Sequence, residues 1–262
     1  MVASDGGPVF IKAIDGSCEF KDKPFIVVVL KDATKEIGHE KVVQVITDNA
    51  SVMKFARALI GEYPKIFWTP CVVHTLNLAL KNICATKNTE KNEVTYEECS
   101  WITRITDDVS FIRVFIMNHS LRLAMFNEFC PLKLLQVADI TFSLVIVMLN
   151  RLKLIKRCLQ AMAISDQWAA YREDDVGKAQ KVKEMILSDR WWDVVDYILE
   201  FTTPIYDMLR VADTDRPCLH LVYEMWDSMI ETVKAAIYRH EGLENDEYSL
   251  FFNVVYDILI DR

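Results

Sequence analysis

The sequence lacks any apolar segment long enough to cross a membrane. Its longest uncharged apolar runs are Phe25–Leu30 and Phe142–Leu149, far short of the roughly 20 residues that a membrane-spanning helix needs. The start of the chain also lacks a basic segment followed by an apolar one, the pattern of a secretory signal. We therefore expect a soluble intracellular protein with no membrane contact.

The chain also lacks an excess of positive charge. It has 30 basic and 38 acidic residues and a net charge of -8, which is the wrong sign for holding phosphate backbones through a general positive field. The only dense cationic cluster is Arg151, Lys153, Lys156 and Arg157. On a helix these residues spread over more than one face, so a solvated surface is favoured over a DNA-backbone contact.

Paired cysteines and the common cofactor motifs are missing too. The seven cysteines are odd in number and mostly have apolar neighbours, which indicates free thiols in a reducing compartment, the nucleus or the cytoplasm. No Gly-rich phosphate loop, dinucleotide fingerprint, Gly-x-Ser-x-Gly elbow or His-Glu-x-x-His motif occurs. The classical cofactor enzymes are therefore not supported.

The chain contains two kinds of sequence pattern, which predict an α/β domain over residues 1–86 and an all-α domain over residues 87–262. Strand patterns occupy Val9–Ile14, Lys41–Thr47 and Ile66–Val73, and an amphipathic helix pattern occupies Ser51–Tyr63. The segment Asp22–Ile37 is ambiguous, because Phe25–Leu30 has the β-branched composition of a strand. Strands that alternate with helices indicate a sheet covered by helices.

Residues after Ala85 have no strand pattern. A polar loop is expected over Ala85–Glu98, followed by a helix that places apolar residues at helical spacing, namely Ile102, Ile105, Val109, Ile112 and Ile116. Ser165 and Ser188 are expected to cap helices, and Pro131 and Pro204 to interrupt them. The aromatic pair Trp191 and Trp192 is expected in the core.

Asp48 follows the apolar strand Lys41–Thr47. The carboxyl ends of strands in open α/β sheets are where ligands bind, and a carboxylate there suits Mg²⁺ or Mn²⁺. The alternative is that Asp48 or Asn49 simply caps the helix that is expected from Ser51, which spacing alone favours.

Cys71 and His74 form a Cys-x-x-His step at the second passage from strand to helix. Their separation is that of half a zinc site, but zinc requires four ligands and no second pair follows at suitable spacing. A complete zinc site is therefore disfavoured, and a packed cysteine with a hydrogen-bonded histidine is the plain alternative.

Both motifs, Thr47-Asp-Asn-Ala50 and Cys71-x-x-His74-Thr-Leu-Asn-Leu78, resemble the ribonuclease H-like core of hAT-family transposases, in the plant branch that carries an adjoining domain of unknown function. The resemblance implies that Asp48 is the second catalytic aspartate, which binds Mg²⁺ or Mn²⁺ in the ancestral enzyme. It also implies that Cys71 and His74 shape the active site and that Asp22–Ile37 is a helix.

The segment Asp139–Ser143 matches the position where hAT transposases carry a Thr-Arg-Trp or Thr-Arg-Phe step, which is implied to handle the flipped base at the transposon end. Phe142 keeps the aromatic ring, but Thr141 stands where the arginine belongs. Phe142 is thus a possible DNA-end contact, although an ordinary core aromatic at the start of a helix is the favoured interpretation.

The resemblance maps residues 7–262 to the interior of a transposase. The first catalytic aspartate is expected upstream of Val9 and the catalytic glutamate beyond Arg262, so Asp48 is left as a single, vestigial acid. Two-metal phosphoryl transfer requires several converging carboxylates. We therefore expect an incomplete ribonuclease H-like mixed sheet followed by an all-α insertion domain, with no nuclease activity and no bound cofactor. The alternatives are a domesticated module that binds protein partners through its helical half, and an active metal-dependent transposase or nuclease that binds DNA.

Overall fold

The computed structural model describes residues 2–4, 7–15, 17, 22–48, 63–90, 92–134, 143–171, 176–214 and 218–260. These residues are mostly helical and fall into two compact units. The first unit comprises Met1–Leu76 and Leu209–His220 with Arg262, and the second comprises Asn77–Met208 and Leu221–Asp261. The units divide within a helix, at residue 76, and the domain boundary expected after residue 86 stays a prediction.

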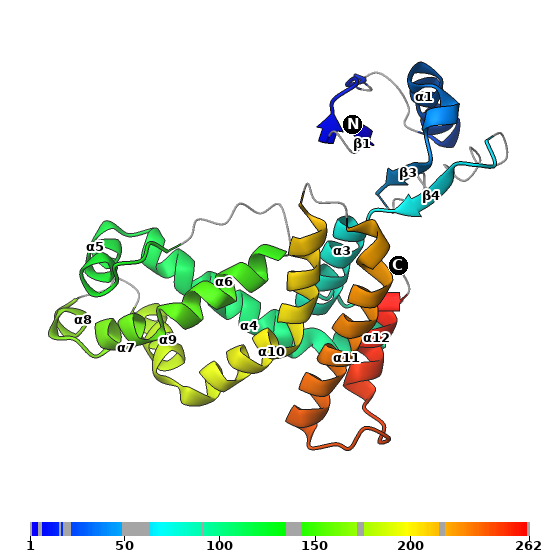
Figure 1. The fold of residues 1–262 in the computed structure, drawn as a ribbon. Coiled ribbons are helices and arrows are strands. Elements are labelled where there is room, and N and C mark those ends of the chain that lie inside the picture. The colour runs from blue at the N-terminus through cyan, green and yellow to red at the C-terminus, as the bar shows by residue number, and fades with distance from the viewer. Residues whose placement is uncertain are drawn as a thin grey trace. The chain divides into compact units, whose positions relative to one another are not determined.

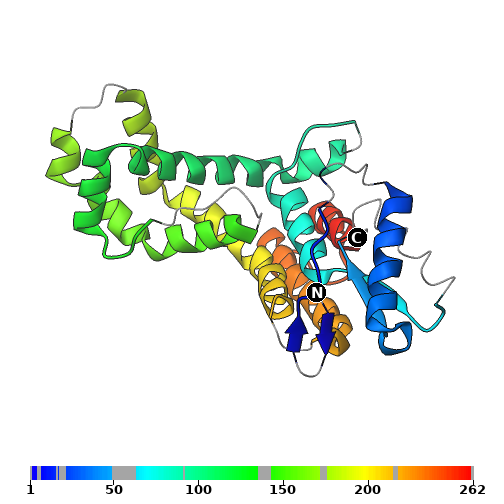
Figure 2. The ribbon, with the colours of Figure 1, turned by 90° about the horizontal axis from the view of Figure 1, so that it is seen from above.

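The described strands all precede α3 in the chain, and α1 lies between the second and the third of them (Figures 1 and 2). In the first unit the elements are β1 (Val2–Ser4), β2 (Gly7–Val9), α1 (Lys23–Ile37), the 3₁₀ helix η1 (His39–Lys41), β3 (Gln44–Thr47) and β4 (Phe67–Pro70). The chain continues with α3 (Val72–Cys84), α4 (Glu93–Met117), α5 (Ser120–Phe129), α6 (Ser143–Leu154), α7 (Lys156–Ala163), α8 (Asp166–Ala170), α9 (Val176–Leu187), α10 (Asp189–Ala212), η3 (Leu219–Leu221), α11 (Val222–Glu241) and α12 (Leu250–Ile260).

The described strands form two separate sheets of two strands each. β1 and β2 pair antiparallel, with Val2 opposite Val9, whereas β3 and β4 pair parallel. The sequence prediction of a strand at Val9–Ile14 is wrong, since β2 ends at Val9 and residues 10–14 are exposed and have no strand partner in the described part of the chain. Gly7, the first residue of β2 and the partner of Ser4, has a φ of 99°, a backbone conformation that glycine favours. The parallel pair supports a short α/β region, and the larger mixed sheet stays a prediction.

The ambiguous segment Asp22–Ile37 is helical. The Asp22 side chain accepts a hydrogen bond from the Phe25 backbone N–H at 3.0 Å, which caps the first turn of α1, and Pro24 lies in that turn. At the other end, the N–H of Gly38 donates to the carbonyls of Thr34 and Lys35, and its φ of 95° suits glycine. These two caps outweigh the strand preference of the β-branched residues between them.

The second unit has a core built around α4. The helix begins at Glu93, so the loop expected over Ala85–Glu98 is shorter than predicted. Its buried residues recur every three or four positions, as an amphipathic helix requires, and are Cys99, Ile102, Thr106, Val109, Ile112, Phe115 and Ile116. Figure 2 shows α6 alongside α4, and α5, α9 and α12 also pack on it. The predicted apolar stripe is confirmed, apart from Ile105, which is half-buried.

The long helix α10 contributes the largest buried side chain. Trp191 and Trp192 are in the core as predicted, and the Trp192 indole donates to the Ile186 carbonyl at 2.8 Å. Ser188 caps the helix through a hydrogen bond from the Trp191 N–H at 3.2 Å. Pro204 lies inside α10, so the prediction that it interrupts the helix is wrong. Packing against the core compensates for the one backbone hydrogen bond that proline removes.

Within the described ranges, no single helix is long and apolar enough to span a membrane. The pair α4 and α5 meets that criterion only when the two helices are taken together, across a bend of 102°.

Candidate functional site

The parallel pairing of β3 and β4 brings two predicted site residues to the same edge. Thr47, the last residue of β3, lies opposite Pro70, the last residue of β4. The ladder continues one step further, because the Cys71 N–H donates to the Thr47 carbonyl at 2.7 Å. Asp48 and Cys71 are therefore the first residues beyond two neighbouring strand ends, which is where open α/β folds place their ligands.

Side-chain hydrogen bonds hold this edge of the sheet. The buried Thr47 hydroxyl accepts from the Trp68 indole at 2.9 Å and donates to the Asp48 carbonyl at 3.0 Å. The Gln44 amide donates to the Thr69 hydroxyl at 2.7 Å on the opposite face of the pair. The backbone around Asp48 is thus fixed from both strands, while the Asp48 side chain is exposed.

Helix α3 starts directly after β4 and carries the histidine of the Cys-x-x-His step. The Thr75 N–H donates to the Cys71 carbonyl at 2.9 Å, which closes the first turn of the helix. His74 lies in that turn and is half-buried, and Cys71 is a half-buried free thiol. The sequence prediction that these residues flank a strand-to-helix junction is thus consistent with the backbone, and their role in shaping an active site stays a prediction.

The described residues at this edge of the sheet do not fit a two-metal centre. Over the described part of the chain, no group of three or more His, Cys, Asp or Glu side chains could hold a metal ion. A centre that stabilises both the attacking and the leaving oxygen requires several converging carboxylates. Asp48 by itself supplies one carboxylate, which is too few to support a catalytic step through Mg²⁺ or Mn²⁺. Among the described residues, Cys71 and His74 likewise have no third and fourth ligand for a zinc ion.

Asp15, an acid in the segment after β2, is hydrogen-bonded within its own turn. Its carboxylate accepts hydrogen bonds from the Ser17 N–H at 2.9 Å and from the Ser17 hydroxyl. These bonds, first the one from the hydroxyl and then the one from the backbone, lower the pKa of Asp15 below its ordinary value. They account for the position of Asp15 without a metal ion.

Of the two candidates for DNA contact, the structure describes the cationic cluster but not Phe142. Phe142 and Thr141 lie outside the described residues, as do residues 51–62 of the helix expected over Ser51–Tyr63. The cationic cluster is divided between the end of α6 and the start of α7. Lys153 pairs with Asp196 at 2.8 Å, and the Lys156 ammonium lies 5.1 Å from the centre of the Trp192 ring. Two of the four charges thus have partners within the helical unit, so they do not form a uniform cationic face.

Part of the chain matches a known family model. Residues 1–112 match the model of a domain of unknown function, DUF659. DUF659 domains occur in hAT-like, transposase-related proteins. The match extends from β1 into α4, so it includes Asp48, Cys71 and His74 and ends before Phe142. No curated protein and no solved structure matches the chain.

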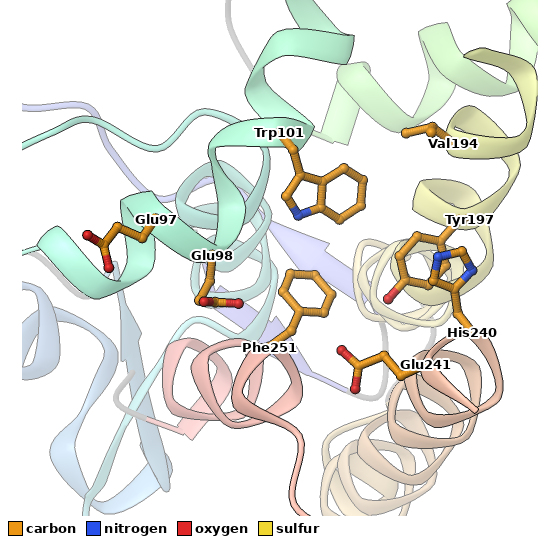
Figure 3. Close-up of a pocket in the computed structure, with 8 residues that line it drawn as sticks. All are labelled: Glu97, Glu98, Trp101, Val194, Tyr197, His240, Glu241 and Phe251. Atoms are coloured by element: carbon orange, nitrogen blue, oxygen red, sulfur yellow. The ribbon is translucent and has the colours of Figure 1, made fainter. Parts of the chain in front are cut away.

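Sequence reasoning missed a cavity of about 370 Å³ in the second unit. Figure 3 shows the side chains that line it, which come from α4, α10, α11 and α12. The charged and aromatic ones that face one another are Glu98, Trp101, Tyr197, His240, Glu241 and Phe251. The acidic and aromatic residues at positions 97–101 were the one local indication of such a cavity. The sequence does not reveal that they meet side chains about 100 and 150 residues further along the chain.

Proposed function

We propose that this chain is a transposase-derived, hAT-like protein of the plant branch that does not cut DNA. In this proposal the first unit is an incomplete ribonuclease H-like fold, and Asp48 is a vestige of its catalytic centre. The DUF659 match over residues 1–112 supports the ancestry. The observation that carries the loss of activity is the position of Asp48 at the end of β3, with no group of three metal ligands among the described residues.

The charge distribution supports the same proposal. The net charge of -8 opposes a general attraction to DNA, and Lys153 is neutralised by Asp196. We place the protein inside the cell, in the nucleus or the cytoplasm, because all six cysteines in the described part of the chain are free thiols.

A nicking assay on the full 262-residue chain tests this function. Supercoiled plasmid is incubated with the protein and Mg²⁺ or Mn²⁺, beside the variants Asp48→Asn and Asp107→Asn. Asp107 is an exposed acid on α4 and provides a control with the same change in charge. We expect no metal-dependent nicking by any of the three proteins. Nicking by the wild type and Asp107→Asn that disappears in Asp48→Asn would establish an active nuclease and refute the proposal.

A second candidate function is a protein-interaction module formed by the helical unit. The observation that favours it is the cavity between α4, α10, α11 and α12, which combines exposed and half-buried carboxylates with aromatic rings. Such a surface suits a protein ligand better than a phosphate backbone, because acidic side chains repel phosphate. The arrangement of these rings and carboxylates determines which class of ligand the cavity fits.

A further inference from the structure

The floor of the cavity consists of three aromatic rings. The rings of Trp101 and Tyr197 are nearly parallel, at an angle of 4° and with centroids 5.6 Å apart. Phe251 adjoins both, at centroid distances of 5.7 Å from Trp101 and 6.4 Å from Tyr197. His240 stacks on Tyr197 at 3.5 Å and fixes its ring. The three rings form a packed aromatic platform, in which Tyr197 and Phe251 are buried and Trp101 is the half-buried ring that reaches the surface.

Carboxylates lie at the rim of this platform. Figure 3 shows those of Glu98 and Glu241 on either side of the Phe251 ring, whereas Glu97 points away from the rings. Within the described ranges, neither Glu98 nor Glu241 is hydrogen-bonded through its side chain or paired with a cation. Burial, followed by the negative charges of Glu241 and Glu200, raises the pKa of Tyr197 above its ordinary range. Among the described residues, these two rim carboxylates thus have no ion-pair partner.

One further acid near the platform is already paired. Glu200 accepts a hydrogen bond from the Arg239 guanidinium at 2.5 Å, and both groups are on the surface. Arg239 is thus engaged with Glu200, and the carboxylates of Glu98 and Glu241 remain for an external ligand.

The aromatic rings and the rim carboxylates together favour a cationic ligand. The faces of aromatic rings carry negative charge and attract cations, most strongly for tryptophan. An anionic ligand would be repelled by the rim, and an apolar ligand would remove water from two carboxylates without replacing their hydrogen bonds. A planar guanidinium suits the site best, because it can stack flat on the half-buried Trp101 ring while its N–H groups point outward to carboxylates at the edge.

We propose that this cavity binds an arginine side chain in a basic segment of a partner protein. The inference rests on the second candidate function, an interaction role for the helical unit, and gives that role its ligand class. Arginine supplies an apolar stem that crosses the rings and a charged end that reaches Glu98 and Glu241. The net charge of -8 attracts a basic segment at long range, so the charges of the two partners are complementary.

Fluorescence anisotropy with the full chain tests the proposal. The probe is a fluorescein-labelled peptide of glycine and serine that carries three arginines. In two matched peptides the arginines are replaced by citrulline, which keeps the shape and loses the charge, or by lysine. We expect the arginine peptide to bind most tightly and the citrulline peptide at least about tenfold more weakly. Equal binding of the arginine and citrulline peptides, or tighter binding of the lysine peptide, would overturn the proposal.

Protein variants assign the binding to the cavity. Glu241→Gln is expected to weaken binding of the arginine peptide about fivefold, whereas Glu231→Gln, an exposed position on the same helix, is expected to leave it within about twofold. Both variants lose one negative charge, so equal effects would show a general charge attraction and refute the site. Trp101→Phe keeps a ring and is expected to weaken binding about threefold. Wild-type affinity in Glu241→Gln and Trp101→Phe would also refute it.

The nicking assay and the peptide-binding assay test the loss of nuclease activity and the arginine site independently of each other. Metal-dependent nicking would refute the loss of nuclease activity and leave the peptide result unchanged. Absence of both nicking and arginine-dependent binding would refute the arginine site alone.

Discussion

Two buried thiols should make the helical unit sensitive to alkaline pH. Cys84 and Cys99 have no exposed surface. Burial, followed by the neighbouring Cys99 thiol, raises the pKa of Cys84 from 9.0 to about 12. Burial, followed by the charge of Glu98, raises the pKa of Cys99 to about 12 as well. The folded protein therefore retains both protons at a pH where the unfolded chain has lost them.

The sign and size of the effect follow from proton linkage. Below pH 9 both states are protonated, so the thiols leave the free energy of unfolding unchanged. Between pH 9 and about 12 only the unfolded state ionises, and stability falls as the pH rises. From pH 8 to pH 10, each thiol reduces the free energy of unfolding by about 1.4 kcal/mol, or about 3 kcal/mol for the pair.

Urea unfolding at pH 8 and pH 10, followed by tryptophan fluorescence under reducing conditions, measures this loss. The double variant Cys84→Ala/Cys99→Ala is less stable at both pH values, because it leaves small cavities. Its loss between the two pH values should nevertheless be about 3 kcal/mol smaller than that of the wild type. Cys218→Ala, at a half-buried cysteine, should behave like the wild type. Equal losses in the wild type and the double variant would refute the reasoning.

Two further predictions concern the first unit. Asp22→Ala removes the cap of α1 and should cost about 1 kcal/mol of local stability, seen as roughly fivefold faster amide exchange in that helix. Asp32→Ala, an exposed site within the same helix, should not accelerate exchange, and equal acceleration would contradict the capping role. In the full chain, amides of β3 and β4 should exchange faster than those of α4 and α10, because their sheet has two described strands and exposes Ile46 and Phe67 to 53% and 69%. Equal protection of the strands and the helices would show that the sheet is covered or extended.

In the first part of the chain, residue composition and helix-capping residues predict different structures for the same segment. The composition of Phe25–Leu30 favours a strand, yet the segment is helical because Asp22 caps its start and Gly38 its end. Both residues were visible in the sequence, so end signals would have resolved the ambiguity. The strand expected at Val9–Ile14 failed for a different reason. A strand requires a partner, and the antiparallel pairing with β1 includes residues 7–9 and leaves the following apolar residues exposed.

At Pro204 the observed structure differs from the local helix preference of the residue. Proline disfavours a helix interior, and the sequence therefore predicted an interruption. The buried residues on both sides, Phe201 and Ile205, hold α10 continuous through that point. Tertiary packing thus overrode a local preference, as it does where a long helix has an extensive buried face.

Sequence patterns alone predicted that Asp48 directly follows a strand-forming segment and that α4 carries an apolar stripe, because these features depend on residues close together in the chain. The strand expected over Ile66–Val73 is shorter than predicted, since β4 ends at Pro70 and α3 begins at Val72, so that Cys71 lies between the two elements. Only the tertiary structure showed that β3 and β4 are parallel neighbours in register, so that Thr47 and Cys71 share a hydrogen bond. It also decided which side chains meet in the cavity of the second unit. Periodicity identifies the buried face of each helix, but which faces meet, and which carboxylates remain at their rim, depends on packing between helices distant in sequence.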